Sequence, residues 1–331
     1  MSKKAHFYVN YNNMVVLKGY LDIIKNALVA NEFECDDVIC LDDLDKNDLY
    51  VFPMGIDAFK YYWKGYKHFI LWQQGVTADE SYMRNQSKLR YSMLNYIDCF
   101  AMKKAKMILF CSDFMKKHYE NLANQSFSHK SYLMPCYNEE LSLTDIDKKD
   151  YDKKYFAYVG SLDLWQCFDK IAALYKEIEN IYPEARFKVL TFSVQEAVEK
   201  IEALEIKNYE VKSVKKEEVQ NELKDVVYGF VIREDSVVNR VATPTKLSSY
   251  LSVGIIPIFS TVLEDFSRIS QSMKYVIPLD ESMNVSSIVD KIDKRVEKDI
   301  LRQEYINLFS TYYGTKYHIA QLVKLVKGIF Q

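Results

Sequence analysis

Short apolar runs rich in β-branched residues alternate along the chain with longer segments whose apolar residues recur at helical spacing. The first pattern predicts buried strands, and the second predicts helices with one buried face. The expected strands are residues 6–9, 38–41, 49–52, 68–72, 107–111, 131–134, 155–161, 187–191, 208–212, 226–232, 255–259 and 274–277. The repeated alternation favours an α/β fold with Rossmann-like repeats and parallel sheets.

The helical segments carry the second pattern. The expected helices are residues 14–30, 169–181, 194–204, 216–224, 245–253, 285–297 and about 300–329, with one further long helix after residue 81. In that long helix, an apolar stripe is expected to face the core, and it consists of Leu89, Met93, Ile97 and Phe100.

A polar, charged segment with little periodicity, residues 138–154, separates the two halves of the chain and is the expected linker. A length of 331 residues is enough for about two domains, each with its own core. We therefore expect one Rossmann-like domain over residues 1–150, a second over residues 151–300, and a terminal helix over residues 301–331.

Composition narrows the class of protein. The hydrophobic fraction of 49% and the charged fraction of 27% are those of a globular protein, and the net charge of −2 argues against a dedicated nucleic-acid-binding protein. The six cysteines form no CxxC pair, so no zinc-site spacing appears and free thiols in a reducing compartment are expected. The N-terminus shows no long apolar segment, and no apolar run reaches the roughly 18 residues of a spanning helix, which favours a cytoplasmic location.

The strongest chemical signal lies in residues 233–260. Arg233, Arg240 and Lys246 surround a loop in which Pro244 stands at the start of a short helix. The N–H groups and the dipole of a helix N-terminus favour negative charge, so the segment suggests an anion site. An ordinary crossover with solvated cations explains the same residues equally well, because charged loop residues are usually exposed.

This segment resembles the nucleotide-sugar-binding segment of family-4-type glycosyltransferases of the GT-B fold, especially bacterial polysaccharide and capsule enzymes. The match consists of residues 244–246 (PTK), residues 250–254 (YLSVG) and Pro257. Residues 72–75 (WQQG), followed by an acidic helix start at residues 79–80, resemble a second segment of the same enzymes.

The chain departs from the family pattern at four positions. Val241 and Ser249 stand where paired glutamates commonly contact the donor ribose. Ser161 and Cys167 stand where many relatives have an arginine and a lysine for the diphosphate. An active enzyme would therefore take its positive charge from the cations of residues 233–246.

The resemblance implies two Rossmann-like domains facing a central cleft, with the C-terminal helix crossing back to the N-terminal domain. The implied hexosyltransferase moves a sugar from a nucleotide-diphosphate sugar, with a UDP-sugar favoured, to a glycan, lipid-linked or protein acceptor, with retention of configuration and without a metal. It would serve cell-surface polysaccharide or glycoconjugate synthesis. Arg233 and Lys246 are the implied catalytic cations. The implied donor-binding residues are Gly160, Ser161, Asn239, Arg240, Ala242, Thr243, Pro244, Thr245 and Ser249, and the implied acceptor-side residues are Asn12, Asn13, Gln73, Gln74, Gly75 and Glu80.

Two other functions stay open. A non-catalytic GT-B subunit that supports a partner glycosyltransferase would explain the four departures. A sugar-nucleotide 2-epimerase shares the architecture and also binds a nucleotide diphosphate, although its acidic and histidine residues are not found here. Lysines over residues 103–117 would either be solvated or contact anionic lipids at the inner face of the cell membrane.

Overall fold

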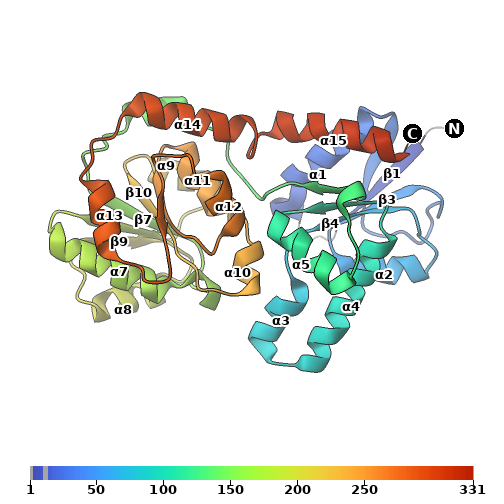
Figure 1. Cartoon of the computed structure of the whole chain (residues 1–331), viewed down its shortest axis with the longest axis horizontal. Helices are drawn as coiled ribbons and strands as arrows, with labels where there is room; N and C mark the ends of the chain where they lie inside the picture. Colours follow the sequence, from blue (N-terminus) through green and yellow to red (C-terminus); the bar gives the residue numbers. More distant parts are fainter. Residues whose placement is uncertain (1–2, 10–13, 331) are drawn as a thin grey trace. The chain divides into compact units, whose positions relative to one another are not determined.

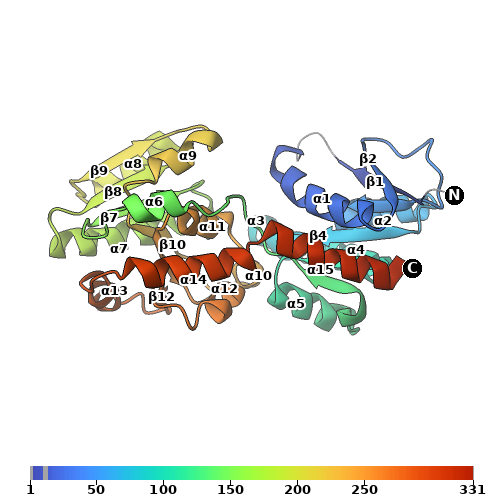
Figure 2. The same cartoon turned by 90° about the horizontal axis from the view of Figure 1, so that it is seen from above.

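The computed structural model describes residues 3–9 and 14–330 (Figure 1). Contacts divide the chain into a first unit, made of Met1–Pro135 and Gly314–Gln331, and a second unit, made of Cys136–Tyr313. Each unit is built around one six-stranded parallel sheet with helices on its faces, which confirms the predicted α/β fold class (Figures 1 and 2).

The sheet of the first unit has the strand order β2-β1-β3-β4-β5-β6. Its strands are β1 (Lys3–Tyr8), β2 (Phe33–Val38), β3 (Leu49–Phe52), β4 (Phe69–Gln73), β5 (Met107–Phe110) and β6 (Ser131–Leu133). Its helices are α1 (Met14–Val29), α2 (Gly55–Trp63), α3 (Thr77–Asn85), α4 (Lys88–Lys104), α5 (Asp113–Ala123), η1 (Ser128–Lys130) and α15 (Thr315–Phe330). β3, β4 and β5 are buried at every position, as expected of strands covered on both faces.

The C-terminal helix α15 packs on α1 of the first unit, as predicted. The buried side chain of Asn31 donates a hydrogen bond to the Val323 carbonyl at 3.1 Å, and the ring of Phe33 meets that of Phe330. The predicted single helix over residues 300–329 is wrong, because α14 (Lys298–Ser310) and α15 are separate. The break falls before Gly314, where Thr311 ends α14 with φ −128° and ψ −80°.

The sheet of the second unit has the order β12-β11-β10-β7-β8-β9. Its strands are β7 (Tyr155–Val159), β8 (Arg186–Leu190), β9 (Tyr209–Lys212), β10 (Tyr228–Val231), β11 (Ile256–Ser260) and β12 (Ile277–Leu279). Its helices, besides α14, are α6 (Leu143–Lys148), η2 (Leu164–Gln166), α7 (Phe168–Ile181), α8 (Val194–Ala203), α9 (Lys216–Glu222), α10 (Val237–Val241), α11 (Thr245–Ser252), α12 (Glu264–Ile269) and α13 (Val285–Ile292). The expected linker, residues 138–154, thus contains α6.

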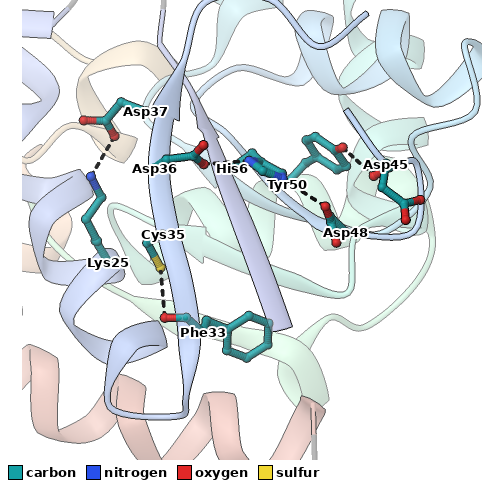
Figure 3. Close-up of polar contacts among 9 residues, drawn as sticks. All are labelled: His6, Lys25, Phe33, Cys35, Asp36, Asp37, Asp45, Asp48 and Tyr50. Carbon is teal, nitrogen blue, oxygen red and sulfur yellow. Dashed lines mark hydrogen bonds and ion pairs between the residues drawn. The ribbon is translucent and has the colours of Figure 1, made fainter. Parts of the chain in front are cut away.

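The predicted strand over residues 38–41 is wrong, because β2 precedes that apolar run. β2 is an edge strand, and its charged side chains pair locally. The ring nitrogens of His6, in β1, lie 2.6 Å from Asp36 Oδ1 and 3.1 Å from Asp48 Oδ2 (Figure 3). Lys25 of α1 pairs with Asp37 at 2.8 Å (Figure 3). These contacts hold the charged residues of β2 in place at the edge of the sheet. Apolar content alone does not identify such a segment as a strand.

The buried face of α4 also differs from the prediction. Leu89 and Met93 are 83% and 53% exposed, whereas Asn95 and Asp98 are buried. Hydrogen bonds explain this orientation. Asp98 accepts hydrogen bonds from Gln73 of β4 and Tyr119 of α5, so the side of α4 that carries Asp98 faces the sheet.

Tyr250 of α11 lies directly on Gly229 of β10. An added Cβ at Gly229 would lie 2.5 Å from the Tyr250 ring. The Tyr250 hydroxyl accepts a hydrogen bond from the Val159 amide of β7 at 3.0 Å. Glycine at position 229 therefore lets α11 sit close to the two central strands.

We expect Gly229→Ala to lower the free energy of unfolding by about 1–3 kcal/mol, because the methyl group would force the Tyr250 ring and α11 outward. Gly328→Ala, in α15, is the matched control, since an added Cβ there meets nothing within 4 Å. Chemical denaturation of the two variants measures both effects. Equal stability of the two variants would show that α11 does not depend on this contact.

Candidate functional site

Strand order identifies where a ligand is expected to bind in the second unit. From β7 the strand order runs to β8 and β9 on one side and to β10, β11 and β12 on the other. The order therefore reverses between β7 and β10. Open α/β sheets bind ligands beyond the carboxyl ends of the strands at such a point. Here β7 ends at Val159, before Gly160, and β10 ends at Val231, before Ile232 and Arg233. A pocket of about 500 Å³ lies at the opposite edge of the sheet, at the amino ends of β7 to β9. Pocket volume alone therefore does not identify the ligand site expected from strand order.

Lys246 reaches this expected site from the first turn of α11. Its ammonium donates a hydrogen bond to Gln166 Oε1 at 2.6 Å and lies 4.4 Å from the centre of the Tyr158 ring. An added Cβ at Gly160, where φ is +140°, would lie 3.1 Å from Lys246 Nζ, so the glycine leaves room for the ammonium. Lys246, which the sequence analysis placed at a helix start, thus lies against the turn after β7.

Arg233 is buried at the end of β10. Its guanidinium donates to the Ile232 carbonyl at 3.0 Å, and its amide donates to Ser260 Oγ at 2.9 Å. Only 6% of Arg233 and 9% of Lys246 is exposed. The structure therefore brings together both residues that were predicted to be catalytic.

The two cations differ from most buried charges in their partners. Within the described part of the chain, neither Arg233 nor Lys246 forms an ion pair with a carboxylate. Burial holds the pKa of Lys246 well below its ordinary value, and the charge of Arg233 lowers it further. Burial likewise lowers the pKa of Arg233. Two buried positive charges without a carboxylate are costly to maintain, so the site has a strong electrostatic preference for an anion.

Arg240 occupies a different environment. Its guanidinium binds both carboxylate oxygens of Asp235 at 2.6 Å and also approaches Glu264 at 3.5 Å. The side chain is 41% exposed. Hydrogen bonding to Asp235 raises the pKa of Arg240, so this cation is already neutralised where it stands.

Several predicted donor-side residues are engaged within the second unit. Asn239 donates to the Glu234 carbonyl at 2.8 Å, and Ala242 donates its amide to the Asn239 carbonyl. Ser161 bonds to Asp163 Oδ2 at 2.6 Å. These contacts shape the loops around the two cations, and the amide of Ala242 is already used.

The residues at the start of α11 hold the helix to residues 136–138. Thr243 Oγ1 accepts a hydrogen bond from the Cys136 amide, and Ser249 donates to Asn138 Oδ1. Pro244, expected to be the first helical residue, is instead the N-cap, and Thr245 begins the helix. A proline side chain accepts no hydrogen bond, so the first turn has no side-chain cap, and the Leu247 amide donates instead to the Pro244 carbonyl at 3.0 Å.

The first unit contains a pocket at the carboxyl ends of β3 and β4. Its volume is about 310 Å³, and its lining includes four predicted acceptor-side residues, namely Gln73, Gln74, Gly75 and Glu80. Gln73 is 3% exposed, and its Oε1 has no hydrogen-bond partner among the described residues. Burial raises the pKa of Glu80. Asn12 and Asn13, also predicted to be acceptor-side residues, lie outside the described residues.

Asp98 lies beneath this pocket and was missed by the sequence analysis. It packs against Gly55, where a Cβ would collide with its carboxylate, and accepts a hydrogen bond from the Tyr119 hydroxyl at 3.0 Å. Burial raises the pKa of Asp98 to about 6. The available signal was a lone carboxylate between Ile97 and Cys99 in an otherwise apolar part of α4.

Asp98 makes stability depend on pH. Because its pKa is higher in the folded protein than in the unfolded chain, its proton stabilises the fold fully below about pH 4, and this contribution is lost as the pH rises through about 6. Relative to Asp98→Asn, the wild-type free energy of unfolding should therefore fall by on the order of 1–3 kcal/mol between about pH 4 and about pH 7. Urea denaturation across this range measures the change.

Asp113→Asn is the matched control, with the opposite sign. Burial would raise the pKa of Asp113, but Lys117 and Lys116 outweigh it and the pKa is lowered. Wild type should therefore gain stability relative to this variant as the pH rises from the acid side. Parallel profiles for the two variants would contradict the environment assigned to Asp98.

No protein-family model and no curated protein sequence matches the chain. Solved structures match its fold. HepE from Anabaena, solved with UDP and glucose, gives a TM-score of 0.68 at 8% identity, over 99% of this chain and 100% of HepE. Sucrose-phosphate synthase from Thermosynechococcus elongatus gives 0.68 at 10% identity, over 99% of each chain.

The chain has the GT-B fold. A third GT-B structure, a mutant of S. aureus TarM in complex with fondaparinux, α-GlcNAc-glycerol and UDP, gives a TM-score of 0.61 at 10% identity and covers 86% of this chain. The chain spans 57% of the length of that TarM protein. The similarity therefore concerns the GT-B architecture, including its C-terminal helix on α1.

Two further observations concern the described residues only. None of their helices is long and apolar enough to cross a membrane. No group of three or more histidine, cysteine, aspartate or glutamate side chains among them could hold a metal ion.

Proposed function

We propose that the chain is a glycosyltransferase that moves a sugar from a nucleotide-diphosphate sugar, in the first instance a UDP-sugar, to an acceptor hydroxyl. The observation that carries this proposal is the pair of buried cations, Arg233 and Lys246, with no carboxylate partner in the described chain. A diphosphate supplies the missing negative charge. UDP in the HepE and TarM structures, which share the fold, supports this type of ligand.

The two cations suit the chemistry of the leaving group. When the bond between the anomeric carbon and the diphosphate oxygen breaks, both electrons go to that oxygen. Lys246 and Arg233 stabilise the developing negative charge, and fixed charges of this kind are typically worth a few kcal/mol each. The acceptor hydroxyl attacks from the same face, and its proton passes to the leaving phosphate. This retaining, metal-independent route requires no protein nucleophile.

The pocket of the first unit is the proposed acceptor side. The unpartnered Gln73 Oε1 is a hydrogen-bond acceptor in a buried position, so it favours a ligand with a hydroxyl donor. Glu80, whose pKa is raised by burial, lines the same pocket. A hydroxyl group of a glycan, lipid-linked or protein acceptor satisfies both. We place this step in cell-surface glycan synthesis on the cytoplasmic side.

One observation favours a second function. Ser249, at the position of a common ribose contact, uses its hydroxyl on Asn138 and on the Thr245 carbonyl. A non-catalytic GT-B subunit that binds a nucleotide sugar and supports a partner enzyme would tolerate the absence of a ribose contact from Ser249. A 2-epimerase remains the third and least supported candidate.

Nucleotide release tests the proposal. Wild type should release UDP or GDP from at least one nucleotide sugar in the presence of a glycan acceptor and a metal chelator, and NMR should show that the product keeps the donor's anomeric configuration. Lys246→Met should lose this release. Tight nucleotide binding without turnover would identify the non-catalytic subunit, and an inverted product would contradict the front-face route.

A further inference from the structure

Leu89 and Met93, the first half of the α4 stripe that the sequence pattern predicts to be buried, are exposed, whereas Ile97 and Phe100 are half-buried. Leu89, Met93 and Tyr96, spaced four and three residues apart along one side of the helix, are 83%, 53% and 62% exposed. In Figure 1, α4 lies beside α2 and forms a hairpin with α3. The side of α4 that faces the sheet is occupied by Asp98 and Leu94 instead.

The exposed stripe continues onto α2. Trp63, 67% exposed, stacks on Phe100 of α4 with ring centres 5.7 Å apart, and Phe59 bridges to Tyr96 at 6.3 Å. Ile56 and Met54, at the start of α2, are 45% and 37% exposed. We call the exposed set Met54, Ile56, Trp63, Leu89, Met93 and Tyr96 the α2–α4 face.

The segments that form the α2–α4 face carry an excess of positive charge, although one of their lysines, Lys64, pairs with Asp42 at 3.1 Å. Residues 54–68 and 84–104 contain eight lysines and arginines and only two aspartates, in a chain whose net charge is −2. Both aspartates, Asp57 and Asp98, have pKa values raised by burial. Lys104 lies within 6.0 Å of the ring centres of Tyr62 and Phe100, so cations and aromatic rings interleave.

We propose that the α2–α4 face binds the surface of an anionic lipid bilayer. Exposed aliphatic side chains insert at the boundary of the acyl chains, tryptophan and tyrosine favour the headgroup level, and lysines attract anionic headgroups. The excess of cations around the exposed apolar side chains complements the negative charge of an anionic bilayer, and this favours lipid as the occupant.

The face adjoins the pocket of the first unit. Met54 belongs to both, since it also lines the pocket beside Gln73 and Gly75. An acceptor anchored in a bilayer would therefore present its headgroup sugar next to Glu80. This last step rests on the proposed function, whereas bilayer binding itself does not.

Vesicle co-sedimentation of the full chain tests the proposal. We expect binding to vesicles of equal parts phosphatidylcholine and phosphatidylglycerol to be at least about tenfold stronger than binding to pure phosphatidylcholine vesicles. Leu89→Ser/Met93→Ser should weaken it about tenfold, and so should Lys103→Gln/Lys104→Gln. The emission of Trp63 should shift to the blue on mixed vesicles, and Trp63→Phe should remove the shift.

Matched controls lie elsewhere on the surface. Phe192→Ser removes a side chain that is 84% exposed in the second unit, and Lys215→Gln/Lys216→Gln removes two adjacent exposed lysines at the start of α9. Both variants should bind like wild type. All the changes are on exposed side chains, so the melting temperatures should stay close to that of wild type. Equal affinity for mixed and for pure phosphatidylcholine vesicles would overturn the proposal. Unchanged vesicle binding by Leu89→Ser/Met93→Ser would also overturn it. So would lipid-free self-association, or capture of a protein, through the same face.

Discussion

Lys246→Met should weaken UDP binding by at least about 100-fold while leaving the free energy of unfolding unchanged or higher. The methionine side chain fills similar space but carries no charge, so the diphosphate loses one of the two cations that face it. Stability should not fall, because the wild-type protein buries this ammonium without a carboxylate, which is itself costly.

The same residue predicts a pH dependence. The pKa of Lys246 is lowered in the free protein, and a bound diphosphate favours the protonated ammonium, so binding takes up a proton. UDP affinity should therefore fall as the pH rises above the lowered pKa, in wild type but not in Lys246→Met. Calorimetry in buffers of different ionisation enthalpy measures the proton uptake. An affinity that rises with pH would contradict the assignment.

Lys149→Met should have the reverse pattern, with a loss of about 3 kcal/mol in the free energy of unfolding and normal UDP binding. Lys149 is 3% exposed and donates to the carbonyls of Leu223, Lys224 and Val226 at 3.3, 2.5 and 2.6 Å. Methionine would leave these carbonyls, which follow α9, without their donor. Burial lowers the pKa of Lys149 to about 7, yet its three acceptors distinguish it from Lys246.

Guanidine denaturation and UDP calorimetry on both lysine variants give the comparison. Lys212→Met is the control for the loss of a surface lysine, since its ammonium pairs with Glu210 and Glu222 at the surface, and it should cost no more than about 1 kcal/mol. If Lys149→Met also loses UDP, or if Lys246→Met is the less stable variant, the two buried lysines do not have the separate roles assigned to them.

The fold was predictable because its signal is local and repeated. Fully apolar runs such as residues 107–110 identify central parallel strands, and Gly254 marks the end of a helix. β2 was missed because it is an edge strand whose charges pair with His6 and Lys25, contacts that exist only after folding. The break before α15 was missed because its apolar stripe continues the pattern of α14.

The candidate site was predictable in part. A family-like segment pointed to Arg233 and Lys246, and the structure buries both, close enough for the charge of Arg233 to lower the pKa of Lys246. That Lys246 lies against Gly160 and Gln166 depends on how α11 docks through Tyr250 on Gly229, which no spacing in the sequence reveals. Leu89 was predicted to be buried and the burial of Asp98 was missed, and both errors have one cause. A hydrogen-bond network, and not apolar periodicity, decides which side of α4 is buried.

Calorimetric titration of wild type with UDP, GDP and uridine in the presence of a chelator is the most direct test of the nucleotide-diphosphate site. Arg233 and Lys246, which have no carboxylate partner among the described residues, predict that one of the two diphosphates binds without metal, at least about 100-fold more tightly than uridine. Failure of both diphosphates to bind, or uridine binding as tightly as UDP, would show that Arg233 and Lys246 do not form a diphosphate site.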